Sequence, residues 1–170
     1  SAAGLSAIKL ADAVGATVIA TTRNESNVSQ LLSNGANYVV IDEGKIEDKI
    51  KEIVPDGVDK VLEFVGPKTL EDSMKCLCKG GICCNTGILG GAEYIPQFDP
   101  IKTIPNNTYL TSFFSNYPTQ EIIDNLFKFI VENNINPNVG CVFTDLADIG
   151  EAHKLMESNT SNGKIIFRLK

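Results

Sequence analysis

Two patterns of apolar residues alternate along the chain, one with the spacing of a helix and one typical of a buried strand. Helical spacing of apolar residues occurs in four segments, at residues 5–14, 24–34, 45–54 and 67–78. Short apolar runs rich in β-branched residues follow them, at 17–21, 38–41, 58–65 and 82–86. Because strand and helix alternate with short Gly or Asn turns, the pattern predicts an α/β fold with a parallel sheet and helices on both faces.

The alternation loosens after Gly87. Residues 88–107 contain prolines, glycines and polar residues, which predicts a long loop. Further elements are expected as a strand at 109–114, helices at 121–132 and 146–158, and a last strand at 164–169. The sequence contains no repeat of fixed period.

Composition narrows the kinds of partner. The chain has 170 residues and a net charge of −6, which argues against nucleic acid as a partner. No apolar run approaches the roughly 18 residues of a membrane span, and no secretory signal is recognisable. Five Cys is an odd number, which favours reduced thiols and a cytoplasmic protein. The expected partner is a small-molecule substrate.

Ligands of open parallel sheets bind where the strands end, so the residues after each strand are the candidates. The strand at 17–21 is followed by Thr22 and Arg23, with no acid before Glu25. In a dinucleotide-binding fold an acid here would accept from the adenosine ribose, whereas an Arg would hold a 2′-phosphate. This favours NADP, and a solvated surface Arg is an equally good interpretation.

Other features have a functional and a structural interpretation. The small residues Ser1 to Gly4 at a helix start would let an anion approach, or they are simply a cap. Gly66 and Gly87 after two strands admit a ligand, or they are ordinary turns. Glu63 is a perturbed acid at a site, or a helix-facing or solvated carboxylate.

Candidates for metal binding and nucleophilic catalysis are weak. Four Cys at residues 76–84 lack the spacing of a zinc site, which favours buried free thiols. His153 is the only His and lies within the helix predicted at 146–158, far from any nucleophile motif, so a structural or surface role is expected. The sequence therefore predicts no metal site and identifies no catalytic acid, base or nucleophile.

Several segments, in order, resemble the medium-chain dehydrogenase/reductase superfamily on its zinc-free, quinone-oxidoreductase-like branch. AGLSAIKLA at 3–11 is similar to GVGLAAIQLA, VGATVIAT at 14–21 to LGAxVIAT, and VDKVLEFVG at 58–66 to VDVVxDxVG. Matching segments also occur at 78–87, 111–114, 151–157 and 163–169. The resemblance covers nearly the whole chain and implies a Rossmann-type doubly wound sheet that binds a dinucleotide.

The resemblance also implies which residues contact the cofactor. Carried over onto this sequence, the contacts fall on four groups: Ala2, Ala3, Gly4 and Leu5 at the pyrophosphate; Thr21, Thr22 and Arg23 at the adenosine ribose and its 2′-phosphate; Phe64, Val65 and Gly66 along the cofactor; and Gly87, Leu89, Phe113 and Phe114 at the nicotinamide. Asn27 stands where family members often carry a Lys for the 2′-phosphate.

The chain also departs from the family pattern. It lacks the catalytic domain and the first, central strand of the fold, which would leave a gap between two halves of the sheet. We therefore expect a fragment that is inactive alone, with an N-terminally truncated dinucleotide-binding domain at 1–144. Residues 145–170 would pack on the missing domain. Sheets of the family pair edge to edge after 109–114, which implies a possible homodimer.

The function implied is hydride transfer from NADPH, with NADH the less favoured cofactor, to a quinone, an enone or a related carbonyl compound. Two alternatives remain open at this point. The chain is a dinucleotide-binding module with a structural or sensing role and no turnover, or it is the enoyl-reductase domain of a larger enzyme.

Overall fold

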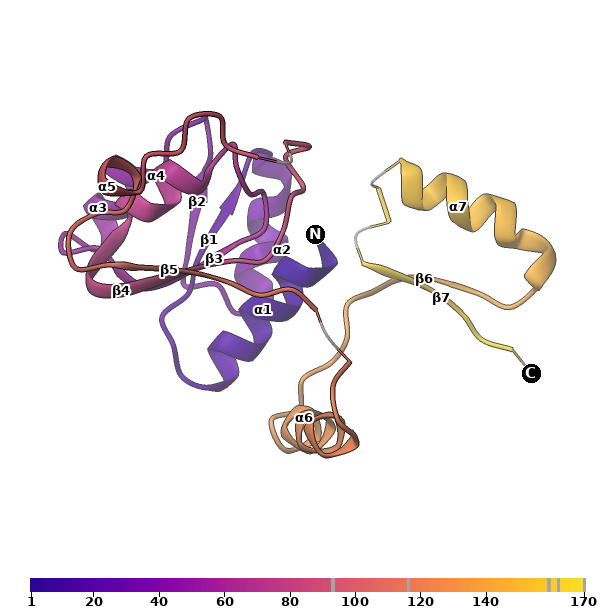
Figure 1. The fold of residues 1–170 in the computed structure, drawn as a ribbon. Helices are drawn as coiled ribbons and strands as arrows, with labels where there is room; N and C mark the ends of the chain where they lie inside the picture. The colour runs from indigo at the N-terminus through magenta and orange to yellow at the C-terminus, as the bar shows by residue number, and fades with distance from the viewer. Residues whose placement is uncertain (93, 116, 159, 162, 170) are drawn as a thin grey trace. The chain divides into compact units, whose positions relative to one another are not determined.

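The structure is a computed structural model that describes residues 1–92, 94–115, 117–158, 160–161 and 163–169 (Figure 1). The chain divides into two compact units. The first contains Ser1–Val18, Gln30–Asn37 and Pro118–Lys170, and the second contains Ile19–Ser29 and Tyr38–Tyr117. The predicted α/β class is confirmed, because every strand pair described is parallel.

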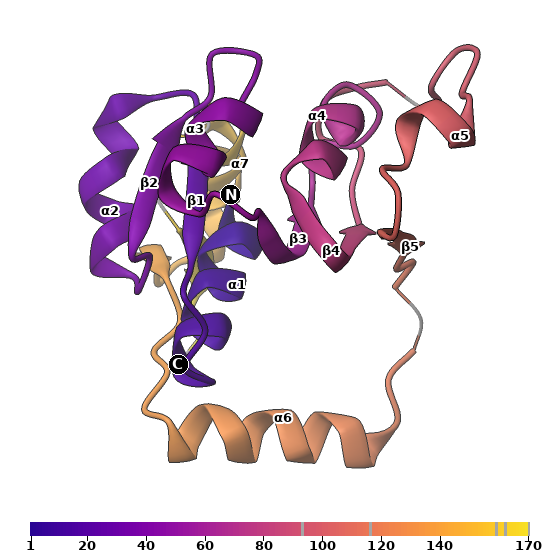
Figure 2. The ribbon, with the colours of Figure 1, turned by 90° about the vertical axis from the view of Figure 1, so that its left-hand side faces the viewer.

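The second unit contains two separate parallel sheets (Figure 2). Strands β1 (Ile19–Thr22) and β2 (Tyr38–Ile41) pair with each other. Strands β3 (Val58–Glu63), β4 (Leu77–Asn85) and β5 (Tyr109–Ser112) pair in that order. No described strand joins β1 to β3, as expected for a Rossmann-type sheet without its first strand.

Apolar contacts connect these two sheets. Val40 of β2 and Ile50 of α3 (Glu47–Ile53) are buried with Cys76, and Ile19 of β1 and Val58 of β3 pack against them. Val40 is buried in this way because α3 packs against it.

Helix α4 (Leu70–Lys75) forms the second cluster. Its Leu70 and Met74 are buried with Leu77 and Cys83 of β4, and Leu110 of β5 packs against them. Two further helices of this unit are the 3-10 helix η1 (Glu25–Asn27) and α5 (Pro100–Thr103). Helix α4 therefore packs against both β4 and β5.

The first unit contains most of the remaining elements. They are α1 (Ala2–Ala13), α2 (Val28–Ser33, which begins in the second unit), α6 (Gln120–Glu132), β6 (Val139–Phe143), the 3-10 helix η2 (Leu146–Asp148), α7 (Ile149–Glu157) and β7 (Lys164–Phe167). Strands β6 and β7 pair in parallel, and the rings of Phe143 and Phe167 stack with their centres 5.3 Å apart. The Lys9 ammonium donates to the Asn136 carbonyl over 2.6 Å, which connects α1 to the segment before β6.

Three local predictions were wrong. The pattern missed β6, a segment of only five residues, and α5, which lies in the expected loop. Residues 79–81, which separate the helix predicted at 67–78 from the strand predicted at 82–86, lie inside β4, where a Cβ on Gly81 would lie 2.9 Å from the Cys78 carbonyl oxygen. Glycine lets the strand continue through this crowded position.

No described helix is both long and apolar enough to cross a bilayer.

Candidate functional site

The second unit brings two of the predicted cofactor segments into direct contact. The turn after β3, at 64–66, is hydrogen-bonded to the segment after β4. The Leu89 amide donates to the Phe64 carbonyl over 3.1 Å, and the Gly90 amide donates to the Val65 carbonyl over 2.9 Å. These bonds place both segments at the carboxyl ends of β3 and β4, where open parallel sheets bind ligands.

Gly66 and Gly87 meet at the centre of this contact. A Cβ on Gly66 would lie 2.5 Å from the Gly87 carbonyl oxygen, and a Cβ on Gly87 would lie 2.3 Å from the Phe64 carbonyl oxygen. Gly66 also has a φ of +88°, a conformation that favours glycine. The two glycines thus allow one turn to pack on the other, which is the structural interpretation of the two that the sequence left open.

Glu63 lies beneath the turn and is buried, with an exposed fraction of 5%. One carboxylate oxygen accepts from the amides of Val65, over 2.7 Å, and Gly66, over 3.1 Å. The other oxygen accepts from the Ser73 hydroxyl of α4. Glu63 is therefore a helix-facing carboxylate, one of the alternatives predicted from the sequence.

The residues predicted to contact the adenosine end of the cofactor lie at the end of β1 and directly after it. Arg23 is exposed, and none of the ion pairs found between described residues involves it. Thr22 is half-buried, and its hydroxyl accepts from the Asn24 amide and from the Asn27 side-chain amide, both over 3.2 Å. Asn27 thus holds the turn that carries Arg23, while the guanidinium remains available for an anion.

The start of α1 lies in the first unit and presents few free donors. The Gly4 amide donates to the Ser1 hydroxyl over 3.1 Å, and the Leu5 amide donates to the Ser1 carbonyl over 3.0 Å. In the described part of the chain the amides of Ala2 and Ala3 have no hydrogen-bond acceptor. Of the four residues predicted at the pyrophosphate, these two retain donors for an anion at the positive end of the helix.

Exposed apolar side chains follow β4 and β5. Leu89, Phe113 and Phe114 have exposed fractions of 70%, 58% and 92%. The Phe113 amide donates to the Asn85 carbonyl over 3.1 Å, which continues the pairing of β4 with β5. Apolar surface of this kind, close to polar groups at the strand ends, suits the stacking of a ring.

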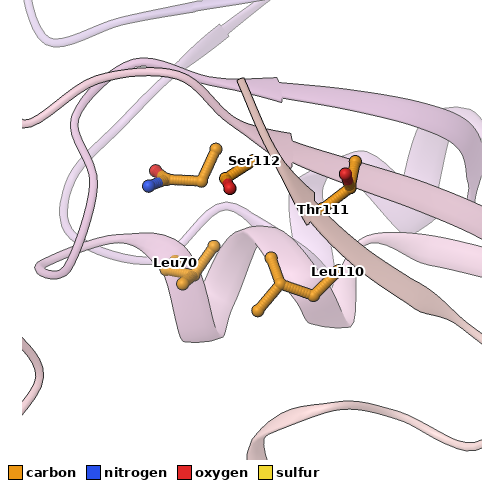
Figure 3. Close-up of a pocket in the computed structure, with 5 residues that line it drawn as sticks. Leu70, Leu110, Thr111 and Ser112 are labelled. Carbon is orange, nitrogen blue, oxygen red and sulfur yellow. The ribbon is translucent and has the colours of Figure 1, made fainter. Parts of the chain in front are cut away.

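Asn85 is a candidate that the sequence reasoning missed. A cavity of about 420 Å³ lies between α4 and the ends of β4 and β5, and its lining is Leu70, Asn85, Leu110, Thr111 and Ser112 (Figure 3). The side-chain oxygen of Asn85 is buried and has no hydrogen-bond partner among the described residues. An unpaired buried acceptor favours a ligand with a donor group. Its position two residues before Gly87 was the available signal.

The described residues do not fit a metal site. Within the described ranges no group of three or more His, Cys, Asp or Glu side chains could hold a metal ion. All five Cys are free. Burial is confirmed for Cys76 and Cys83, whereas Cys78 and Cys84 are only half-buried. His153 lies on the exposed side of α7, as predicted.

Burial should make Cys76 and Cys83 unreactive. Loss of hydration raises the pKa of each thiol to about 12, and nearby acidic groups contribute. At about pH 8 only about one thiol in ten thousand is then the reactive thiolate. A thiol reagent should modify the half-buried Cys78, Cys84 and Cys141 first and reach Cys76 and Cys83 only in denaturant, as peptide mapping by mass spectrometry would reveal. Modification of Cys83 in the folded protein would contradict the packing of β4 on α4.

Comparison with known proteins places this chain in a family. A sequence model of the zinc-binding dehydrogenases matches residues 2–132. The chain is 30% identical to a rat (Rattus norvegicus) quinone oxidoreductase over 98% of its own length and 51% of that protein. It is 26% identical to an acryloyl-coenzyme A reductase of Sulfurisphaera tokodaii, over 97% of the chain and 47% of the relative. The chain spans about half the length of these relatives.

Solved structures share the fold. The crystal structure of a protein named AibC matches with a TM-score of 0.85 and 25% identity, over 98% of this chain and 46% of that one. A mycobacterial protein solved with NADPH matches with a TM-score of 0.75 and 23% identity, over 96% of this chain and 52% of the other. The architecture described above is thus found in proteins of about twice this length.

Proposed function

Because the chain belongs to the medium-chain dehydrogenase/reductase superfamily, as a cofactor-binding domain of its quinone-oxidoreductase-like branch, we propose that the whole protein is an NADPH-dependent reductase. Arg23 carries this proposal. It is an exposed cation directly after β1, without an ion-pair partner among the described residues, and no acid lies between β1 and Glu25.

The preference for NADPH over NADH follows from charge. The 2′-phosphate of NADPH would be repelled by the acid that usually binds the free ribose hydroxyls. A guanidinium offers two parallel N–H donors to such a phosphate. The exposed Thr21 hydroxyl adds a neutral donor beside Arg23, whereas the Thr22 hydroxyl already holds the turn.

Other residues would hold the remainder of the cofactor. The amides of Ala2 and Ala3, which have no acceptor in the part of the chain that the structure describes, suit the pyrophosphate. Phe64, Val65 and Gly66 would border the cofactor, and the Asn85 oxygen would accept from a donor group at the ends of β4 and β5. NADPH, when bound, supplies the hydride and its electron pair.

Gly87, Leu89, Phe113 and Phe114 would flank the nicotinamide. The exposed side chains among them would be covered in the complete protein, and they would keep water from the hydride. We propose a quinone or an alkene conjugated with a carbonyl as the acceptor. The rat relative is named for quinones, and the Sulfurisphaera relative for acryloyl-coenzyme A, which is such an alkene.

Assembly and location are part of the same proposal. Strand β5 is at the end of the β3-β4-β5 order and pairs with no further described strand, so two copies can join their sheets edge to edge at β5. Five free Cys fit a cytoplasmic protein without zinc. The helix and strand at 145–170 would return to the catalytic domain.

Reductase activity is tested on the full-length protein. NADPH and NADH are each mixed with a small quinone or an enone, and oxidation is followed by loss of absorbance of the reduced nicotinamide. We expect turnover with NADPH and little with NADH. Binding of NADPH without turnover on either acceptor would favour a non-catalytic dinucleotide-binding module, and absence of binding to both cofactors would refute the proposal.

A further inference from the structure

Glu63 is a buried carboxylate that has no counter-ion among the described residues. It ends β3, its exposed fraction is 5%, and none of the ion pairs between described residues includes it. A buried carboxylate is unfavourable unless hydrogen bonds replace its lost hydration. Three donors do so here, and they come from only two places in the structure, the turn after β3 and helix α4.

The carboxylate links that turn to the helix. The amides of Val65 and Gly66 donate to one oxygen, and the Ser73 hydroxyl donates to the other. Two successive amides that point at one charged oxygen restrict the backbone of the turn to one conformation. The Ser73 hydroxyl fixes the carboxylate, so the position of the turn depends on α4.

The turn after β3 is in turn hydrogen-bonded to the segment after β4. The Glu63 carbonyl accepts from the Thr86 amide over 2.8 Å, and the carbonyls of Phe64 and Val65 accept from Leu89 and Gly90. Three consecutive carbonyls therefore hold residues 86–90. A shift of the turn would displace Leu89 together with Phe64, although these residues are 25 positions apart in the sequence.

We propose that Glu63 and Ser73 are positioning residues that hold both strand-end segments in the shape that binds the nicotinamide half of the cofactor. The inference rests on the proposed function. It follows from pre-organisation, because a surface that is already ordered loses less conformational freedom when a ligand binds. Neither side chain needs to touch the cofactor, since both act through the backbone at 64–66 and 86–90.

The test uses full-length protein and NADPH itself as the probe. Glu63→Ala removes all three acceptor contacts and should weaken NADPH binding about tenfold or more. Glu63→Gln keeps an oxygen for the two amides and an amide for Ser73, so it should stay within about threefold of the parent. Ser73→Ala removes one contact and should weaken binding by about threefold. Glu71→Ala, on exposed Glu71 of α4, is the matched control and should bind as the parent does.

Dissociation constants are measured by fluorescence titration, well below the unfolding midpoint of each variant. A purely structural role would lower the unfolding midpoint and leave the dissociation constant of the folded protein unchanged, and that result overturns the inference. If Glu63→Ala does not fold, Ser73→Ala decides, and unchanged affinity in that variant overturns it. If the parent protein binds neither NADPH nor NADH, the proposed function fails and the inference fails with it.

Discussion

Arg23→Ala in the full-length protein is expected to weaken NADPH binding about tenfold or more and to leave NADH binding within about twofold. The reason is that only NADPH carries the 2′-phosphate. A hydrogen-bonded contact with that charged group is worth roughly 1.5–3 kcal/mol. The measurement is a fluorescence titration of each cofactor at one fixed, low salt concentration, because salt screens an exposed charge pair.

Two further variants sharpen this result. Arg23→Lys keeps the charge and loses the two-pronged geometry, so its NADPH affinity should fall between those of the parent and Arg23→Ala. Arg168→Ala removes the other arginine of the chain, also exposed, and should bind both cofactors normally. An equal loss of NADH and NADPH affinity in Arg23→Ala would contradict the 2′-phosphate assignment.

Gly87→Ala is expected to destabilise the protein by about 2–4 kcal/mol. The added Cβ would lie 2.3 Å from the Phe64 carbonyl oxygen and 3.0 Å from the Phe64 carbonyl carbon. Both are backbone atoms, and the Leu89 amide holds the Phe64 carbonyl in place. Relief of the overlap therefore requires a shift of the backbone in one of the two turns. Separation of the two turns should also abolish high-affinity cofactor binding. Urea unfolding of the full-length protein measures the loss of stability.

Gly150→Ala is the matched control for this prediction. Gly150 lies in α7, and outside the backbone of that helix and its two chain neighbours no atom of the described residues would lie within 4 Å of an added Cβ; alanine favours a helix by up to about 1 kcal/mol. The control should therefore be neutral or slightly more stable than the parent. A Gly87→Ala protein as stable as the control would mean that the turns after β3 and β4 do not pack as described.

Periodicity made most of the elements predictable. The segments around α1, α6 and α7 show helical spacing, and β1, β2 and β3 are short apolar runs between turn residues. These patterns are local, because a helix or a strand buries one face whatever its neighbours are. The separation of β1–β2 from β3–β4–β5 was predicted as well, because the strand that the family places between them does not occur in this sequence.

Strand β6 could not be predicted in the same way. Its burial pattern is irregular, and its main support is pairing with β7, more than twenty residues later in the chain. The glycines at 79–81 were misleading for a related reason. The turn propensity of Gly80 and Gly81 is local, whereas the place of Gly81 inside β4 depends on its close approach to the Val58 carbonyl oxygen of β3.

The candidate site shows the same division. The sequence by itself determined the elements, their order and the residues that follow each strand, including Arg23 and the glycines after β3 and β4. Only the tertiary structure decided that Gly66 and Gly87 pack on each other, that Glu63 is buried beneath Val65 and against Ser73, and that the Asn85 oxygen lacks a partner. Local propensity acts within a few residues, whereas burial and hydrogen-bond partners depend on segments that meet only when the chain folds.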